Sequence, residues 1–311
     1  MKTVTLGNTG ITVNRNGFGA LPIQRISVEE AGKLLRKAYD NGIRFFDTAR
    51  AYSDSEYKIG QALADVRDDI IIATKTASTT VEGFWKDLET SLSMLKTDHV
   101  DIYQFHTPSF CPKPGDGTGL YEAMLEAKAQ GKIRHIGLSN FSQADMETFM
   151  TMVDIDEQQG LYNMFERNTD SYHNIPLAYK TEKEMLPNVH KYGQAFLPYS
   201  PLFQGLLAGK FKNGINFSAR DIRNENPKFS KGRFEVYYEG YKRVQAIADE
   251  MEKPIAQVAI NWLRQKEDVT SIINGVSSLS QLEKNVSAME WDISDEYMAK
   301  LNAAIAEFED M

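Results

Sequence analysis

Short, mostly apolar runs alternate along this chain with longer stretches whose apolar residues recur at helical spacing. Gly42–Asp47 belongs to the first kind, and such a run is typical of a buried strand. Ser27–Asp40 belongs to the second kind, with apolar residues at positions 31, 34, 35 and 38. Ser27 and Glu30 also have the spacing of a capping box. The pattern therefore predicts a helix that begins after Ser27 and leads into a strand.

The alternation continues over most of the chain. It predicts eight strands, at residues 16–20, 42–47, 69–75, 100–105, 133–138, 155–159, 194–198 and 269–273. It predicts helices at residues 27–40, 55–64, 81–95, 119–130, 143–150, 178–192 and 279–288, and others before the last strand. Strands that alternate with helices favour a parallel sheet, and a (β/α)8 barrel needs roughly 250 residues. We therefore expect an α/β protein, a (β/α)8 TIM barrel that fills residues 1–311 as a single domain.

Three segments lie outside the repeating plan. Val4–Val13 has the pattern of a small β-hairpin, turning at Asn8-Thr9-Gly10, and we expect it to plug the bottom of the barrel. Ser200–Arg233 reads as a long loop, which in a compact protein usually has a function. Ser294–Glu309 predicts an extra C-terminal amphipathic helix.

Composition narrows the class of protein. The formal net charge of −8 argues against a nucleic-acid partner, which requires clustered positive charge. A single cysteine, Cys111, permits no intrachain disulfide and favours a reducing compartment. No stretch reaches the ~18 apolar residues of a membrane helix, and the N-terminus lacks the apolar run of a secretory signal. We expect a cytoplasmic protein with no membrane partner.

The residues at the strand ends are unusually polar. Catalytic groups of a (β/α)8 barrel lie at the carboxyl ends of its strands. Here those ends carry Asp47, Lys75, His106, Ser139-Asn140, Gln159, Tyr199 and the turn Gly275–Ser278. Taken singly, Asp47 has an alternative role as a turn cap and Lys75 as a solvent-facing lysine. Taken together, the ring of polar groups predicts an active site.

Three of these residues, Asp47, Lys75 and His106, form a coherent set for carbonyl chemistry together with Tyr52. Reduction of a carbonyl requires a proton for the developing alkoxide, and the O–H of Tyr52 is a suitable donor. A free phenol has a pKa of about 10, and we expect the ammonium of Lys75 to lower it. Asp47 would hold Lys75 in place, and His106 would orient the substrate oxygen. Core packing is the alternative role for Tyr52 and for His106.

The motifs that carry these residues resemble those of the aldo-keto reductase family. The resemblance covers Phe46–Tyr52, Ile72–Lys75 and Tyr103–His106. It continues through Gly131–Phe141, Tyr199–Leu202 and Gly205–Lys210. It spans essentially the whole chain and implies an NADP-dependent oxidoreductase that reversibly reduces aldehydes or ketones. It also implies a barrel that binds an extended nicotinamide cofactor without a Rossmann domain. The absence of a convincing G-x-G-x-x-G between a strand and a helix agrees with this.

The resemblance also implies a set of cofactor-binding residues. Ser139, Asn140 and Gln159 would bind the nicotinamide carboxamide, and Tyr199 would stack on the ring. The pyrophosphate would lie along Ser200, Leu202, Gly205 and Lys210, and the adenosine end along Gly275 to Ser277, Gln281 and Asn285. Helix capping is the alternative role for Ser139 and Asn140, and packing for Tyr199.

The choice between NADP(H) and NAD(H) depends on basic residues near the adenosine. A 2′-phosphate favours arginine or lysine, but the turn from Asn274 to Gln281 carries no positive charge. Lys210 and Arg220 lie in the long loop instead, and relatives that resemble potassium-channel β subunits use basic residues at matching positions. We therefore expect NADP(H), with NAD(H) as the alternative.

The substrate is less defined by the sequence than the reaction. We expect a small carbonyl compound, bound by a pocket lined by Leu21, Ile23, Tyr52, Trp85, Phe110 and Phe203. Three other functions remain open: a slowly reacting channel-associated subunit, a Schiff-base aldolase that uses Lys75, and a metal hydrolase. The five histidines show no i, i+4 pair, and no metal is expected. The oligomeric state is left open.

Overall fold

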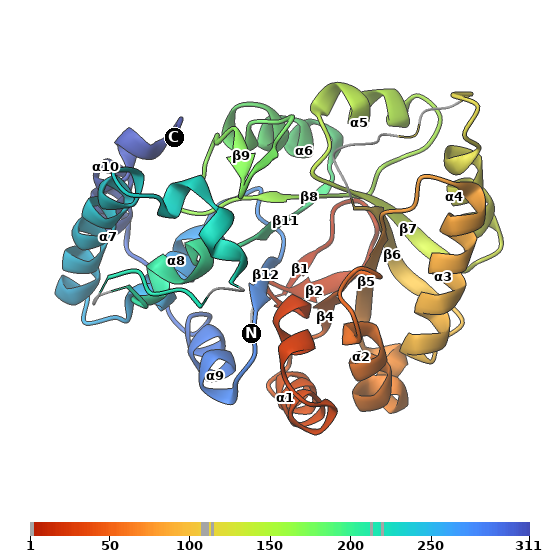
Figure 1. Cartoon of the computed structure of the whole chain (residues 1–311), viewed down its shortest axis with the longest axis horizontal. Coiled ribbons are helices and arrows are strands. Elements are labelled where there is room, and N and C mark those ends of the chain that lie inside the picture. Colours follow the sequence, from red (N-terminus) through yellow and green to blue (C-terminus); the bar gives the residue numbers. More distant parts are fainter. Residues whose placement is uncertain (1–2, 107–111, 113–114, 212–213, 219–220) are drawn as a thin grey trace.

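The computed structural model describes residues 3–106, 112, 115–211, 214–218 and 221–311. Its centre is a closed barrel of parallel strands in the order β11-β12-β3-β4-β5-β6-β7-β8 (Figure 1). The strands are β3 (Asn16–Gly19), β4 (Phe45–Asp47), β5 (Ile71–Thr76), β6 (Val100–Phe105), β7 (Ile133–Ser139), β8 (Glu157–Leu161), β11 (Ala195–Tyr199) and β12 (Ile272–Gly275). Each overlaps a strand expected from the sequence, although β12 shares only residues 272 and 273 with the expected one, and the barrel fold is confirmed.

Helices surround this barrel. They are α1 (Val28–Asp40), α2 (Ser55–Leu63), α3 (Val81–Leu95), α4 (Leu120–Ala129), α5 (Gln143–Met150), α6 (Leu186–Tyr192), α7 (Arg233–Glu250), α8 (Ile255–Arg264), α9 (Leu279–Ser287) and α10 (Asp295–Ala304). The capping box at the start of α1 is present, since the Glu30 backbone N–H donates to Ser27 Oγ over 3.2 Å. Among the described residues, no helix is long and apolar enough to cross a membrane.

One expectation about these elements was wrong. The helix expected at 178–192 starts later, with a π-helical turn at Thr181–Met185 followed by α6. Before it comes a hairpin of β9 (Ser171–Tyr172) and β10 (Ile175–Pro176), whose strands are too short to show a periodic pattern. The long loop expected after β11 is present, and it contains 3₁₀ turns at Phe203–Ala208, Ile222–Glu225 and Pro227–Phe229.

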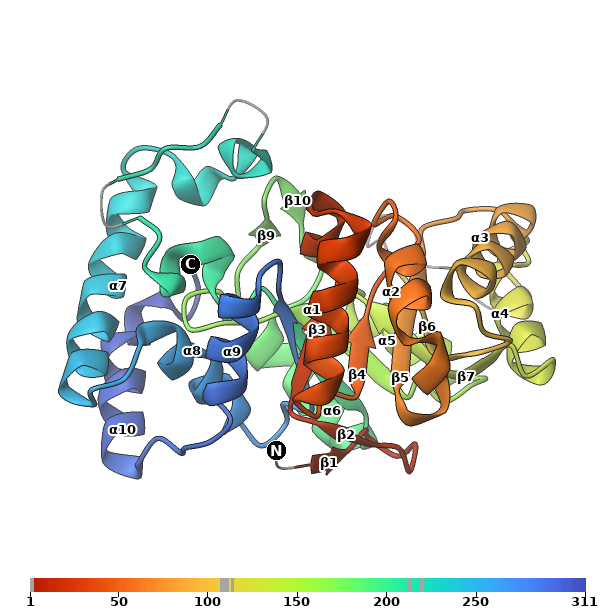
Figure 2. The ribbon, with the colours of Figure 1, turned by 90° about the horizontal axis from the view of Figure 1, so that it is seen from below.

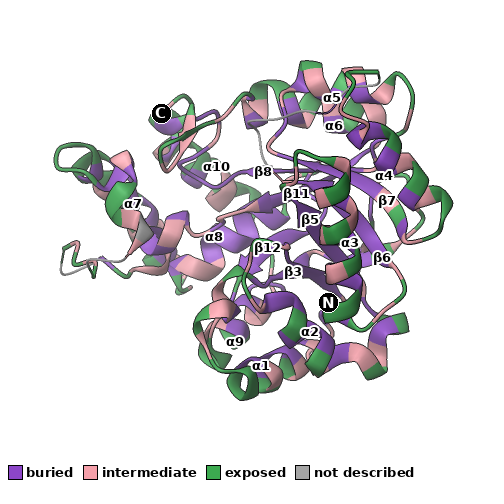
Figure 3. Cartoon of the chain, turned by 45° about the vertical axis from the view of Figure 1, so that its right-hand side comes forward, coloured by how far each residue is buried: buried purple, intermediate pink, exposed green. Residues whose placement is uncertain are grey.

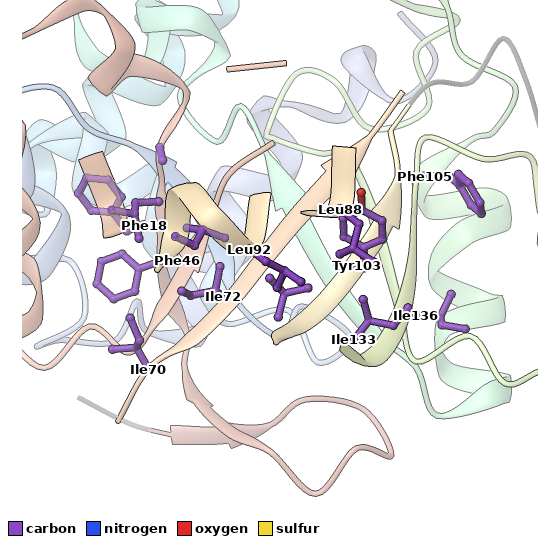
Figure 4. Close-up of a cluster of buried hydrophobic side chains, with 14 of the residues drawn as sticks. Phe18, Phe46, Ile70, Ile72, Leu88, Leu92, Tyr103, Phe105, Ile133 and Ile136 are labelled. Atoms are coloured by element: carbon purple, nitrogen blue, oxygen red, sulfur yellow. The ribbon is translucent and has the colours of Figure 1, made fainter. Parts of the chain in front are cut away.

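The two-residue period of each strand separates the barrel interior from the layer beneath the helices. Phe46 and Ile72 lie in the outer cluster, between strands and helices, as Figure 4 shows. Their neighbours Phe45 and Ala73 belong to a separate cluster that fills the barrel. The strands are therefore buried on both faces, as their colouring in Figure 3 shows, and this explains why their sequences are apolar runs rather than alternating ones.

The N-terminal hairpin closes one end of the barrel. β1 (Thr3–Thr5) pairs with β2 (Thr12–Asn14), and Leu6 and Val13 are buried in the cluster that fills the barrel. Gly7 has a φ of +52°, and a Cβ there would lie 2.6 Å from the Ala195 backbone nitrogen. The chain passes too close to β11 for a side chain at this point. The expected plug is confirmed, and the site must lie at the other end.

Candidate active site

Side chains at the carboxyl ends of β4, β5, β8 and β11 point into the barrel for the same reason that their apolar neighbours do. Asp47 is two residues after Phe45, and Lys75 is two residues after Ala73, so each shares the interior face with a residue of the cluster that fills the barrel. Lys75 and Asp47 are 0% and 2% exposed, respectively. Strand periodicity alone thus brings an ammonium and a carboxylate into the same dry space.

Lys75 and Asp47 form a buried ion pair with further partners. Lys75 Nζ donates to Asp47 Oδ2 and, over 2.7 Å, to the Thr48 carbonyl oxygen. Gln159 Nε2 donates to the same carboxylate oxygen over 3.0 Å. A buried pair is stable only when such extra hydrogen bonds offset the loss of water. The contact expected between Lys75 and Asp47 is therefore present, and β8 contributes to it.

Tyr52 and His106 lie next to this ion pair. Their rings meet edge to face with centroids 5.6 Å apart, and Lys75 Nζ lies 5.7 Å from the centroid of the Tyr52 ring. The turn that carries Tyr52 is joined to β5, because the Arg50 backbone N–H donates to the Lys75 carbonyl over 3.0 Å. The four residues expected to act together are thus brought together by β4, β5 and β6.

The acidity of Tyr52 differs from the expectation. Burial, then the negative charge of Asp47, then the nearby Tyr172 raise the pKa of Tyr52 far above its ordinary value. The expected lowering by Lys75 does not prevail, because burial raises this pKa and Asp47, the partner of the ammonium, acts on the phenol in the opposite direction. Tyr52 therefore keeps its proton throughout the neutral range, as a proton donor must.

His106 is an uncharged imidazole in this environment. Burial, followed by the positive charge of Lys75, lowers the pKa of His106 to about 3. A neutral imidazole still has one N–H to donate and one nitrogen to accept a hydrogen bond. His106 can therefore orient a carbonyl oxygen without competing with Tyr52 as the acid.

A buried carboxylate that the sequence reasoning missed holds the turn of Tyr52 in place. Glu56 is 1% exposed, accepts a hydrogen bond from Thr74 Oγ1 over 2.6 Å and forms an ion pair with Arg50. Arg50 precedes Tyr52 by two residues, and Thr74 directly precedes Lys75. The arrangement ties the turn to β5. Its signal in the sequence was slight, because Glu56 reads as an ordinary residue of a helix first turn.

The residues expected around the nicotinamide form one hydrogen-bonded group. Tyr199 Oη donates to Asn140 Oδ1 over 2.7 Å, and Asn140 Nδ2 donates to Ser139 Oγ over 3.1 Å. Tyr179, which was not expected here, also donates to Asn140 Oδ1 over 2.9 Å. Asn140 has a φ of +66°, a left-handed conformation that asparagine tolerates better than most residues. Asn140 therefore holds the Tyr199 side chain by its hydroxyl.

The residues expected along the rest of the cofactor follow β11 and β12. Gly205 has a φ of +109°, and a Cβ there would lie 2.9 Å from Lys210 Cδ. Partial burial, then the positive charges of Arg223 and Arg25, lower the pKa of Lys210. The Lys210 ammonium forms no hydrogen bond or ion pair with the residues that the structure describes, so its charge is available to a ligand.

The other expected cofactor residues are less closely grouped. Leu202 packs against a hydrophobic cluster, and Asn285 is buried within α9. The Ser277 backbone N–H and hydroxyl both donate to Gln281 Oε1, over 2.9 and 3.2 Å. Gly275 ends β12, beside the 3₁₀ turn Leu21–Arg25. Arg220 lies outside the described residues.

The expected pocket lining is only partly supported. Ile23 and Phe203 are 0% and 1% exposed and belong to hydrophobic clusters. Trp85 packs against the outer cluster, with Lys132 Nζ 5.6 Å from its ring centroid. Phe110 and Cys111 lie outside the described residues. No group of three or more His, Cys, Asp or Glu residues suited to a metal ion occurs in the described part of the chain.

The geometry agrees with the comparisons to known proteins. The sequence model described as "Aldo/keto reductase family" matches residues 15–306. The chain belongs to the aldo/keto reductase family. It is 30% identical to the aldo-keto reductase YhdN of Bacillus subtilis, over 98% of this chain and 94% of the relative.

Two further family members bear on function. An NADH-specific methylglyoxal reductase of Escherichia coli is 25% identical, over 95% of each chain. The solved structure of a glycerol dehydrogenase from Gluconobacter oxydans superposes with a TM-score of 0.84 at 25% identity, covering 98% of this chain and 95% of that one. The chain is thus a member of an oxidoreductase family that uses nicotinamide cofactors, including one relative named for NADH.

Proposed function

We propose that the protein reduces small aldehydes or ketones to alcohols, and oxidises the alcohols in reverse, with Tyr52 as the proton donor. The observation that supports this best is the placement of a protonated phenol beside a neutral His106 and a buried Lys75–Asp47 pair. An acid that holds its proton at neutral pH is what carbonyl reduction requires. The site lies at the carboxyl ends of the strands, where barrel enzymes carry out catalysis.

Each residue has a distinct part in the proposed reaction. The His106 N–H donates a hydrogen bond to the carbonyl oxygen and favours the charge that develops there. Tyr52 then transfers its proton to that oxygen. Lys75 stabilises the resulting phenolate, while Asp47 and Gln159 keep the ammonium in position. A nicotinamide bound beside them supplies the hydride.

The residues along β11 and its loop fit such a cofactor. Tyr199 offers an aromatic face held by Asn140. Lys210 offers a positive charge that has no ion-pair partner among the described residues, next to a loop with Gly205 in a left-handed conformation. We favour NADPH because Arg223 and Arg25 both lower the pKa of Lys210, so three cations lie near one another and can bind a phosphate, with Asp221 as the partner of Arg223. NADH remains the alternative, since one relative is named for it.

The substrate is proposed to be a small oxygenated carbonyl compound. Two relatives are named for methylglyoxal and for glycerol, both of which are small oxygenated molecules. The single cysteine favours the reducing cytoplasm as the compartment of the reaction.

Consumption of NADPH, and separately of NADH, with a reactive aromatic aldehyde tests this function. We expect turnover with wild-type protein, a higher kcat/KM with NADPH, and the reverse reaction with the alcohol and the oxidised cofactor. Borohydride added with aldehyde alone distinguishes an aldolase, because it converts an imine on Lys75 into a stable adduct that can be located on that residue. Labelled Lys75 without cofactor turnover would contradict the proposal.

A further inference from the structure

The hairpin of β9 and β10 brings a second tyrosine to the site. The β9–β10 hairpin lies at the end of the barrel opposite to the β1–β2 hairpin (Figure 2). Ile175 is 52% exposed, whereas Tyr172 is partly buried against β11. The hairpin therefore has a solvent side and a side that faces the site.

The side chain of Tyr172 is fixed at two points. Its hydroxyl lies 2.9 Å from Ser200 Oγ, within hydrogen-bonding distance. Its ring meets that of Tyr199 at 72°, with centroids 5.2 Å apart. Tyr199 ends β11 and Ser200 follows it, where the nicotinamide is expected to lie. Tyr172 is also near Tyr52, since it contributes, after burial and Asp47, to the raised pKa of Tyr52.

The base of the hairpin is anchored by buried charges. Lys228 Nζ donates to Glu166 Oε1 over 2.6 Å and to the Ser171 carbonyl over 2.9 Å. The side chains of Lys228 and Glu166 are 3% and 1% exposed. Asn163 Nδ2 donates to Glu166 Oε2 over 2.7 Å and to the Ser200 carbonyl over 3.0 Å. Because breaking a buried ion pair is costly, the hairpin is a fixed part of the site rather than a swinging one.

We infer that Tyr172 is a specificity-determining residue, whose fixed ring closes the carbonyl-binding space on the side of β11 and limits the size of the substrate. The inference rests on the proposed reductase function. A rigid aromatic wall excludes a larger substituent by overlap, since its hydrogen bond to Ser200 and its packing on Tyr199 leave it no alternative position. Small changes of pocket volume alter kcat/KM roughly 10- to 200-fold.

Three variants and two aldehydes test this inference. We expect Tyr172→Ala to raise the kcat/KM of naphthaldehyde relative to that of propanal by about 10-fold or more. Tyr172→Phe keeps the ring and should stay within about 3-fold of the wild-type ratio. Ile175→Ala, on the solvent side of the same hairpin, is the matched control and should leave the ratio unchanged. The dissociation constant of the cofactor should stay the same in all three.

Two outcomes would overturn the inference. One is a ratio of kcat/KM for naphthaldehyde to kcat/KM for propanal that is the same in Tyr172→Ala as in wild-type protein. The other is altered cofactor affinity without a change of size ratio, which would make the ring a cofactor contact. Calorimetric binding of both aldehydes in the presence of oxidised cofactor gives a second readout that needs no turnover. Absence of turnover in wild-type protein counts against the proposed function. A changed ratio of the two aldehyde affinities in Tyr172→Ala would still support the role of Tyr172 in limiting substrate size.

Discussion

Gln159 Nε2 lies 3.0 Å from Asp47 Oδ2, although 112 residues separate the two in the sequence. Asp47 is therefore held from two sides, by Lys75 of β5 and by the amide of β8. A residue expected to bind only the cofactor also supports the buried Lys75–Asp47 ion pair. Loss of this amide should thus affect the chemistry as well as cofactor binding.

Replacement of this amide tests its second role. Gln159→Met keeps the volume but removes a hydrogen bond to a charged group, which contributes roughly 1.5–3 kcal/mol. We expect a lower free energy of unfolding by about that amount and a clear fall in kcat at saturating cofactor. Gln158→Met is the control, because Gln158 bonds Gln143 and Gln194 instead. Equal kcat in the two variants would contradict the role of Gln159.

Removal of one partner of the Lys75–Asp47 pair should be costlier than removal of both. Lys75→Met leaves Asp47 buried and unpaired, and a loss of roughly 3–5 kcal/mol of stability is expected. The double variant Lys75→Met/Asp47→Leu should recover much of that stability in urea unfolding. Neither variant should regain turnover, since both lack the ammonium beside Tyr52. Recovered activity in the double variant would show that Lys75 has no part in the reaction.

The low pKa of His106 makes stability depend on pH in a defined window. An unfolded histidine binds a proton below about pH 6.5, whereas folded His106 stays neutral down to about pH 3. The unfolded state therefore binds the extra proton, and the folded protein should lose stability as pH falls from about 6.5 toward 3. Denaturant unfolding across this range should show a smaller loss in His106→Gln. A slope identical to that of wild-type protein would mean that His106 is not buried as a neutral imidazole.

The carboxylate of Glu56 should affect the rate through the position of Tyr52. Glu56→Gln removes the ion pair with Arg50 while keeping an acceptor for Thr74. A small displacement of a catalytic group can cost roughly 100-fold in rate, so we expect kcat to fall by about 10- to 100-fold with unchanged cofactor affinity. An unchanged kcat would leave Glu56 with a purely structural role.

A matched control separates positioning from general loss of stability. Asp101 is also fully buried, and it is paired with Arg67 and Arg134. Asp101→Asn should lower the midpoint of thermal unfolding without changing kcat. If Asp101→Asn and Glu56→Gln reduce kcat alike, the effect of Glu56 is not specific to Tyr52.

The barrel was predictable because its strands are buried on both faces. Apolar runs such as that ending in Phe45 and Phe46 stand out against helices with a 3.6-residue period, and the polar residue after each run marks the site. The β9–β10 hairpin was not predictable in this way, since each strand has only two residues. Tyr172 was missed with it.

The raised pKa of Tyr52 could not be predicted from the sequence either. The direction of this pKa shift depends on the opposing charges of Asp47 and Lys75 and on how deeply the phenol is buried. Sequence spacing brings the three groups together but does not give their distances. The choice of partner for Glu56 likewise depends on the contact between a turn and a neighbouring strand.

The most direct test of the whole account is turnover and cofactor binding measured side by side in Tyr52→Phe. The substitution removes the proton donor and leaves the ring contact with His106 in place. We predict near-complete loss of aldehyde reduction, with the dissociation constant of NADPH close to that of wild-type protein. Near-wild-type turnover in Tyr52→Phe would contradict the assignment of Tyr52 as the acid, and with it the proposed mechanism.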